Sequence, residues 1–203
     1  MLEIQIPIDK LLWLNNFCSK DLTETRGFAQ IILTKIQDIV YLIATNGHIC
    51  IFYKVDKISS DKELENGKNY CIYLGKKEIN YLKNINNFEY IYIDFERGEF
   101  WSASLPRVFC SPYRNCDFDF ENWLKWIKGD EKLQQQQNNL YKINYKLLKS
   151  FCYEDDTLIF SSYNDKVLYV QIPNLPNCFG FLSKMYNDNI QFNENFKNFK
   201  LFN

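Results

Sequence analysis

The sequence predicts an α+β protein built from antiparallel sheets. Two observations predict this class. Short runs that alternate apolar and polar residues are typical of strands, and short segments with helical spacing lie between them. The order of one strand, one helix and three strands then recurs, twice within residues 1–128 and once more, in part, within residues 140–186. We therefore expect a repeated β-α-β-β-β unit.

The first unit begins at residues 2–7, where apolar and polar residues alternate as in a half-buried strand. Asp9 is expected to cap a helix that starts at Lys10. The apolar side of this helix carries Leu11, Leu12, Leu14 and Phe17. After a polar loop at residues 19–27, three strands are predicted at residues 28–35, 39–45 and 48–55.

A hairpin signal lies between the last two of these strands, at Asn46-Gly47. Asn-Gly favours a type I′ turn because both central residues of that turn need positive φ. The sequence therefore predicts a hairpin with a type I′ turn centred on Asn46 and Gly47. On the residues alone, a simple buried connection is the favoured interpretation of this hairpin.

The second unit follows a charged stretch at residues 56–69, which is predicted to be a loop. A strand at residues 70–74 precedes a short helix at residues 76–85. The remaining strands of this unit are expected at residues 88–95, 100–105 and 107–110.

The third unit is separated from the second by residues 129–139, a polar stretch with a glutamine run that is predicted to be a linker. Asn144 is expected to cap a helix whose apolar residues are Leu147, Leu148 and Phe151. Strands are predicted at residues 157–162, 166–173 and 178–182. Residues 187–203 are expected to be a poorly ordered tail.

Composition limits the function classes. The net charge of −1 gives no basic signal over the whole chain, so any surface for nucleic acid must be local. The chain has seven cysteines, without a Cys-x-x-Cys pair, and one histidine, so a zinc site is not expected. Cysteines 50, 71, 152 and 178 are expected in the core, in a reducing, cytoplasmic setting. We predict no signal peptide and no transmembrane segment.

No residue pattern supports catalysis. His48 lacks a nucleophile or an orienting carboxylate beside it in sequence, which favours a structural or pocket-wall role. Asp117, Asp119 and Glu121 alternate and could hold Mg²⁺ as in a nuclease, but their neighbours are aromatic and no base lies beside them. Because a glycine-rich phosphate loop is also lacking, we expect no enzyme, no metal and no cofactor.

Two segments resemble a known family. Residues 44–48, Ala-Thr-Asn-Gly-His, resemble the Ala-Thr-Asp-Gly-His-Arg-Leu signature of the middle domain of bacterial DNA polymerase sliding clamps, the polymerase III β subunits. Residues 120–127, Phe-Glu-Asn-Trp-Leu-Lys-Trp-Ile, are similar to the segment that closes that domain. Asn46 stands for the usual Asp, Ile49 for the usual Arg, and Glu121 for the usual Pro.

The resemblance implies a clamp-like fold with helices on one face and sheets outside. Residues 1–128 would form one clamp-like domain of two units, and residues 140–186 half of the next, while the family's first domain is expected to be missing. Ring closure is then an open question. The chain could assemble with its own copies into a ring, or remain an open arc.

Lysines on the predicted helices are candidates for contact with duplex DNA. Lys146 and Lys149 share one face of the third helix because they are three residues apart. The other candidates precede that helix, lie on the second helix or flank the first, and are Lys142, Lys76, Lys83, Lys10 and Lys20. Such lysines neutralise phosphates without reading the base sequence. The alternative is an ordinary solvated lysine face.

The resemblance also implies a peptide site where the two motifs meet. In the family, polymerases and other DNA-processing proteins dock a short linear peptide there. The matching positions are Thr45, Gly47, His48, Ile49, Cys50, Lys125 and Trp126. Because Ile49 replaces an arginine and Trp126 a smaller residue, this pocket is expected to be more apolar or partly filled. The alternative is that these residues are only core and turn.

Three hypotheses follow. The first is a sliding-clamp-like accessory protein of DNA replication, a processivity factor that contacts duplex DNA and docks replication proteins. The second is a clamp-fold binding module, of a phage or mobile-element type, that engages replication proteins without encircling DNA. The third is an unrelated α+β domain.

Overall fold

The computed structural model describes residues 2–20, 28–60, 64–66, 68–85, 90–102, 108–109, 143–153, 157–162 and 167–183. The first unit comprises β1 (Leu2–Pro7), α1 (Ile8–Leu14), the 3-10 turn η1 (Asn15–Phe17), β2 (Ile31–Ile36), β3 (Ile39–Thr45) and β4 (Ile49–Lys54). The second comprises β6 (Asn69–Ile72), α2 (Lys76–Asn84), β7 (Tyr90–Asp94), β8 (Glu99–Trp101) and β9 (Val108–Phe109).

The third unit begins with α4 (Tyr145–Leu148) and the 3-10 turn η3 (Lys149–Phe151). Its strands are β10 (Ile159–Ser162), β11 (Val167–Gln171) and β12 (Cys178–Ser183). The part of this unit before Ile143 lies outside the described residues, and from α4 onward the order is as predicted. As predicted, the side chain of Asn144 caps α4, accepting a hydrogen bond from the backbone N–H of Lys146 at 3.0 Å.

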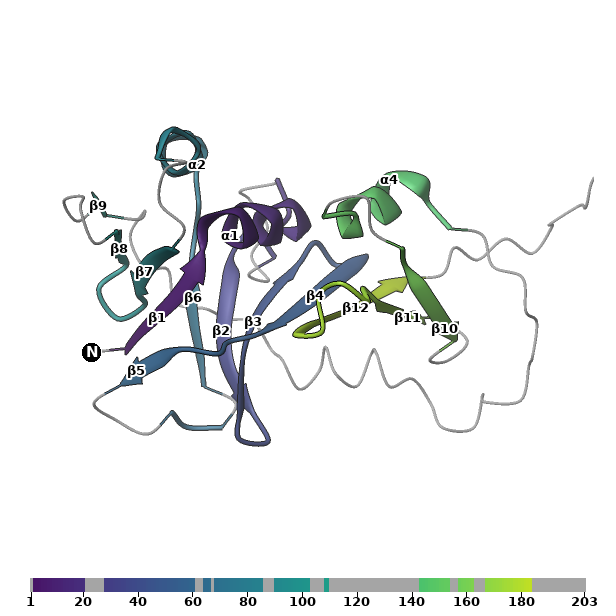
Figure 1. The fold of residues 1–203 in the computed structure, drawn as a ribbon, viewed down its shortest axis with the longest axis horizontal. Coiled ribbons are helices and arrows are strands. Elements are labelled where there is room, and N and C mark those ends of the chain that lie inside the picture. Colours follow the sequence, from purple (N-terminus) through teal and green to yellow (C-terminus); the bar gives the residue numbers. More distant parts are fainter. Residues whose placement is uncertain are drawn as a thin grey trace, which may run out of the picture.

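The first two units exchange strands. β1, which opens the first unit, pairs antiparallel with β7 of the second. β6, which opens the second unit, pairs antiparallel with β2 of the first. The described strands thus form a five-stranded sheet of order β5-β1-β7-β8-β9 and a seven-stranded sheet of order β10-β11-β12-β4-β3-β2-β6 (Figure 1). Neither unit completes its sheet without the other.

Two local predictions were wrong. The loop predicted at residues 56–69 contains a short strand, β5 (Ile58–Ser60), whose three residues are all exposed and which pairs with β1. This segment is a strand because it pairs with β1, and its sequence has no strand-like periodicity. The first helix also begins earlier than Lys10, at Ile8, because Pro7 ends the strand with a φ of −59° and serves as the N-cap. Asp9 lies within the first helical turn, where its carboxylate faces the positive end of the helix.

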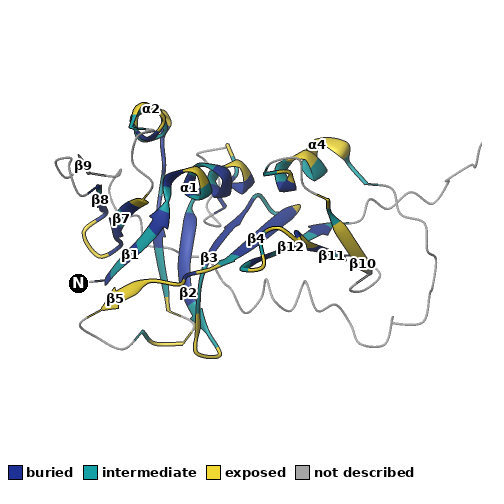
Figure 2. Ribbon diagram, in the orientation of Figure 1, coloured by how far each residue is buried: buried dark blue, intermediate teal, exposed yellow. Residues whose placement is uncertain are grey.

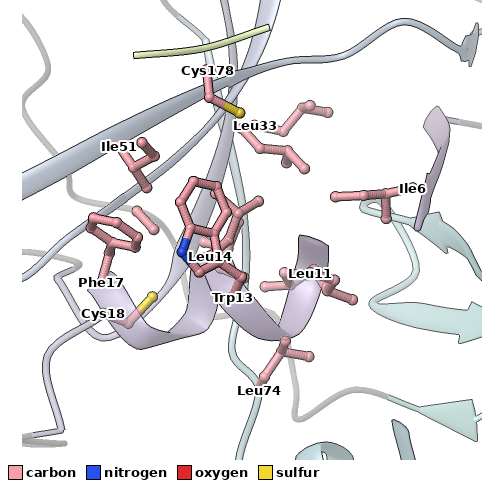
Figure 3. Close-up of a cluster of buried hydrophobic side chains, with 14 of the residues drawn as sticks. Ile6, Leu11, Trp13, Leu14, Phe17, Cys18, Leu33, Ile51, Leu74 and Cys178 are labelled. Atoms are coloured by element: carbon pink, nitrogen blue, oxygen red, sulfur yellow. The ribbon is translucent and has the colours of Figure 1, made fainter. Parts of the chain in front are cut away.

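The core lies between α1 and the strands, as Figure 3 shows for Leu11, Trp13 and Leu14 against Leu33 and Ile51. A second, smaller cluster covers the other face of the seven-stranded sheet and contains Phe28, Ile32, Ile43, Cys50, Phe52 and Cys71. Residues 31–34 of β2 and 42–45 of β3 are therefore buried on both faces, and these stretches are mostly apolar instead of alternating (Figure 2).

A strand pair and a row of aromatic rings join the third unit to the first. β12 pairs antiparallel with β4, with Phe181 opposite Cys50. Across this pair, the rings of Phe52 and Phe179 stack with centroids 4.8 Å apart. On the helical side, the indole N–H of Trp13 donates to the carbonyl of Ser150 at 3.0 Å. The two units thus share one continuous sheet.

The cysteines divide into three groups. Cys18, Cys50 and Cys178 are free and buried, and burial raises the pKa of the Cys18 thiol to about 12. Cys152 is free but exposed, so its predicted place in the core was wrong. Cys71 is buried as predicted and is disulfide-bonded.

Candidate nucleic-acid interface and hairpin pocket

A groove of about 1130 Å³ runs between the helices of all three units. Figure 1 shows α2, α1 and α4 along the same side of the two sheets. The floor of the groove includes Trp13 of α1, and its rims are formed by α2 and by the segment from α4 to Cys152. Three short helices that are far apart in the sequence therefore form the groove together.

Five of the seven lysines predicted to contact DNA line this groove, namely Lys20, Lys76, Lys83, Lys146 and Lys149. All five are exposed. The one acidic residue among the lining residues is Asp9, so the groove carries a formal charge of +4 in a chain of net charge −1. Within the described part of the chain, no carboxylate forms an ion pair with any of the five. Their charges are therefore available to an anionic partner.

Of the other two lysines predicted to contact DNA, only Lys10 belongs to the described residues. Lys10 is half-buried and does not line the groove, because its ammonium group lies 3.2 Å from the centre of the Tyr153 ring. This cation–π contact ties α1 to the third unit. Lys142 lies outside the described residues.

Several polar side chains of the groove were missed by the sequence analysis as functional residues. Asn15 and Asn16 follow α1, Asn80 lies between the groove lysines Lys76 and Lys83 of α2, and Ser19 and Ser150 complete the set. Such groups are neutral hydrogen-bond partners for phosphate and sugar oxygens. The adjacent pair Asn15-Asn16 at the end of a predicted helix was the one available signal for them.

The predicted hairpin is present, and Thr45 of β3 lies opposite Cys50 of β4. Its turn, however, is not of type I′. Gly47 has a φ of 88°, whereas Asn46 has a negative φ. The backbone N–H of Asn46 donates to the carbonyl of Ile49 at 3.3 Å. The turn is therefore centred one residue later, with glycine first, as in a type II′ turn.

The type I′ geometry occurs at the neighbouring hairpin instead. Between β2 and β3, Gln37 and Asp38 have φ values of 47° and 67°, with Ile36 paired to Ile39. Both central residues are then left-handed, as this turn requires. Gln37 is an uncommon residue for such a position, and no turn was predicted there from the sequence.

Hydrogen bonds among residues 45–49 hold the turn of this hairpin. The hydroxyl of Thr45 donates to the carbonyl of Ile49 at 2.7 Å and accepts from the N–H of Gly47 at 3.1 Å. The side-chain oxygen of Asn46 accepts from the N–H groups of His48 and Ile49 at 2.9 and 3.1 Å. An asparagine oxygen performs this role as an aspartate would, so Asn46 preserves the turn.

A small cavity lies beside this hairpin. All five predicted hairpin residues line it, together with Val167, Phe181 and Ser183 of β11 and β12, which the sequence analysis missed. Its volume is only about 10 Å³. Thr45, Ile49 and Cys50 are buried, so among the five only Gly47 and His48 present surface to solvent. Lys125 and Trp126 lie outside the described residues.

Among the described residues, no group of three or more His, Cys, Asp or Glu side chains could hold a metal ion. Asp117, Asp119 and Glu121 lie outside those residues. None of the helices in the described ranges is long and apolar enough to cross a membrane.

Solved structures of bacterial sliding clamps have this fold. The DNA polymerase III β subunit of Borrelia burgdorferi, in complex with a natural product, has a TM-score of 0.62 at 15% identity over 91% of this chain and 64% of its own. The Bartonella birtlesii clamp bound to griselimycin has a TM-score of 0.58 at 13% identity, over 91% of this chain and 66% of its own. The Thermotoga maritima β subunit has a TM-score of 0.54 at 10% identity, over 93% of this chain and 66% of its own.

The chain therefore has the sliding-clamp fold, and its α+β class with repeated units is confirmed. It spans less than two thirds of the length of these clamps. No protein-family model matches the sequence, and no curated protein matches it by sequence. The low identities mark a divergent form of the DNA polymerase III β subunit architecture.

Proposed function

We propose that this protein is a non-enzymatic, clamp-like accessory factor that binds duplex DNA without sequence preference through the lysine groove. The single observation that carries the proposal is the concentration of five exposed lysines in one groove of an otherwise slightly acidic chain. Flexible ammonium groups neutralise phosphates wherever these lie, which suits a protein that does not read bases.

The groove also has the supporting features that such a role needs. Its lysines come from three places, namely α2, the segment from α4 to η3, and the segment after η1, so a partner must be long enough to meet all of them, as a duplex is. The asparagines and serines between them offer hydrogen bonds to backbone oxygens. No base-reading arginine lines the groove among the described residues.

Replacing Lys146 and Lys149 together with Ala should weaken binding to a linear 30-base-pair duplex on the order of tenfold. The slope of log affinity against log salt concentration should become shallower by about 1.8, since each lost phosphate contact removes about 0.9. Fluorescence anisotropy with a labelled duplex, over a series of salt concentrations, measures both quantities.

The matched control is Lys54→Ala with Lys57→Ala, which changes the net charge equally. Both lysines are exposed and neither lines the groove. This control should keep the parental slope. If the two double variants lose affinity equally, net charge and not the groove governs binding, and the proposal fails.

A second candidate function is a clamp-fold binding module that engages replication proteins without holding DNA. The net charge of −1 and the loss of the family's arginine and proline, where this chain has Ile49 and Glu121, favour it. Under this function the parental chain would show no salt-dependent duplex binding, while the hairpin site would still take a ligand.

For that site we propose an apolar partner segment held beside the hairpin, with His48 at its rim. Because the cavity is only about 10 Å³, the ligand must rest on the turn and displace side chains such as Phe181. The wall supplied by β12 belongs to the third unit, so the site needs both units.

Griselimycin, to which the Bartonella birtlesii clamp is bound, is a suitable probe. We expect it to bind this chain and His48→Ala to weaken binding by about tenfold, or about 1.4 kcal/mol. Isothermal titration calorimetry measures this. Asn174→Ala, at a residue that does not line the cavity, is the control. Equal affinity of His48→Ala and the parent would remove the hairpin from the binding site.

A further inference from the structure

Two tyrosines of the lysine groove have no part in the binding of duplex DNA. Tyr73, which lies between β6 and α2, and Tyr153, which follows η3, both line the groove. The bases of a duplex are paired and stacked on each other, so a groove that does not read sequence meets phosphates and sugars. An aromatic ring in this groove must therefore serve either packing or another ligand.

Packing accounts for Tyr153. The ammonium group of Lys10 lies 3.2 Å from the centre of its ring. The ring of Trp13 meets it edge to face, with centroids 5.4 Å apart, and Tyr153 packs against the main hydrophobic cluster. The Tyr153 ring is thus engaged in the joint between the first and third units.

Packing does not account for Tyr73. Its side chain is half-buried, yet it belongs to neither hydrophobic cluster. Within the part of the chain that the structure describes, no aromatic ring or ammonium group packs against it. Beside it lies Gly75, where a Cβ would come within 3.2 Å of the Tyr73 ring, so the missing side chain leaves the ring uncrowded. Tyr73 therefore presents ring surface to the groove.

Lysines and a neutral polar group follow this ring along α2. Lys76, Asn80 and Lys83 are four and three residues apart, so they share one face of the helix, and all three line the groove. Proteins that hold single-stranded DNA without sequence preference combine these two features, an aromatic ring on which a base stacks and cations that track the phosphates. The start of α2 has both.

We propose that the groove also holds single-stranded DNA, with one base stacked on Tyr73 and the neighbouring phosphates on Lys76 and Lys83. This inference rests on the proposed role of the groove in binding DNA and adds a second form of DNA to it. Pockets of about 300–1,000 Å³ enclose whole small ligands. The groove, at about 1130 Å³, therefore has room for a whole nucleotide beside the ring. Every base has a π face, so the contact has little sequence preference.

Fluorescence anisotropy with three labelled ligands tests the stacked base. The ligands are an oligothymidylate of about 12 nucleotides, an abasic strand with the same number of phosphates, and a linear duplex. We expect the parent to bind the thymidylate about tenfold more tightly than the abasic strand, because only a base can stack on Tyr73. The abasic strand carries the same charge, so it isolates the contribution of the base from that of the phosphates.

Tyr73→Ala should lower the affinity for the thymidylate about tenfold, to that of the abasic strand. Tyr73→Phe keeps the ring and should bind the thymidylate as the parent does. Tyr73→Ala should keep the duplex affinity and the far-ultraviolet circular dichroism of the parent, since its lysines are unchanged. The matched control is Tyr90→Ala, at a 37% exposed tyrosine of β7 that does not line the groove, and it should bind all three ligands as the parent does.

Equal affinity of the parent for the thymidylate and the abasic strand overturns the inference, because no base is then stacked. A Tyr73→Ala variant that binds the thymidylate as the parent does also overturns it. Both results leave the duplex proposal to the lysine variants. If the parent instead binds the thymidylate in a way that requires Tyr73 but does not bind the duplex, the inference stands and the duplex proposal fails.

Discussion

Phe151→Ala should lower the free energy of unfolding by about 4 kcal/mol. Phe151 is fully buried, and its ring meets that of Phe17 edge to face with centroids 5.0 Å apart. Truncation removes a large apolar side chain between the first and third units and leaves a cavity that rigid strands cannot close. Urea unfolding followed by circular dichroism measures the change.

Tyr145→Ala is the control for this result, because Tyr145 lies in the preceding helix and is 74% exposed. Its substitution should change stability by no more than about 0.5 kcal/mol. If the two variants are equally stable, Phe151 does not join the units. A double-mutant cycle with Phe17→Ala should also give a coupling of about 1 kcal/mol between the two rings.

Gly180→Ala should destabilise the protein by about 3 kcal/mol. A Cβ at this position of β12 would lie 2.6 Å from the carbonyl oxygen of Cys50 and would also collide with the Phe151 ring. The carbonyl belongs to the paired strand β4 and the ring is fully buried, so neither can move without cost. Thermal and urea unfolding of the purified variant would report the loss.

Gly75→Ala separates crowding from the general effect of adding a methyl group. There the nearest atom to the new Cβ is a carboxylate oxygen of Glu78, at 2.7 Å, which is the end of a flexible side chain. Gly75 is the N-cap of α2, and Ala at an N-cap costs about 1 kcal/mol or less. A Gly180→Ala variant as stable as Gly75→Ala would mean that β12 is free to move away from β4.

Local patterns were sufficient for most elements of the fold. β1 is buried at alternate positions as its sequence predicts, and β3 has the predicted bounds of residues 39–45. The helix of residues 76–85 is present with one residue fewer, as α2. These elements depend on neighbouring residues in the chain, which is what periodicity and capping report.

Features that depend on distant residues could not be predicted. β5 is a strand only because β1 lies beside it. The groove needs three helices in one place, and Asn15 gains significance only beside Lys83 and Lys149. For the hairpin, the sequence predicted the turn and a core place for Cys50, but not that Val167, Phe181 and Ser183 of the third unit would line the same cavity. Pairing of β4 with β12 crosses more than a hundred residues.

The exchange of β1 and β6 has a consequence for synthesis of the chain. β1 gains its first neighbour, β5, when residues 58–60 have been made, and its second, β7, only when residues 90–94 have followed. β2 likewise gains its second neighbour, β6, only with residues 69–72. The pairing that joins the first two units therefore forms after most of both units has been synthesised.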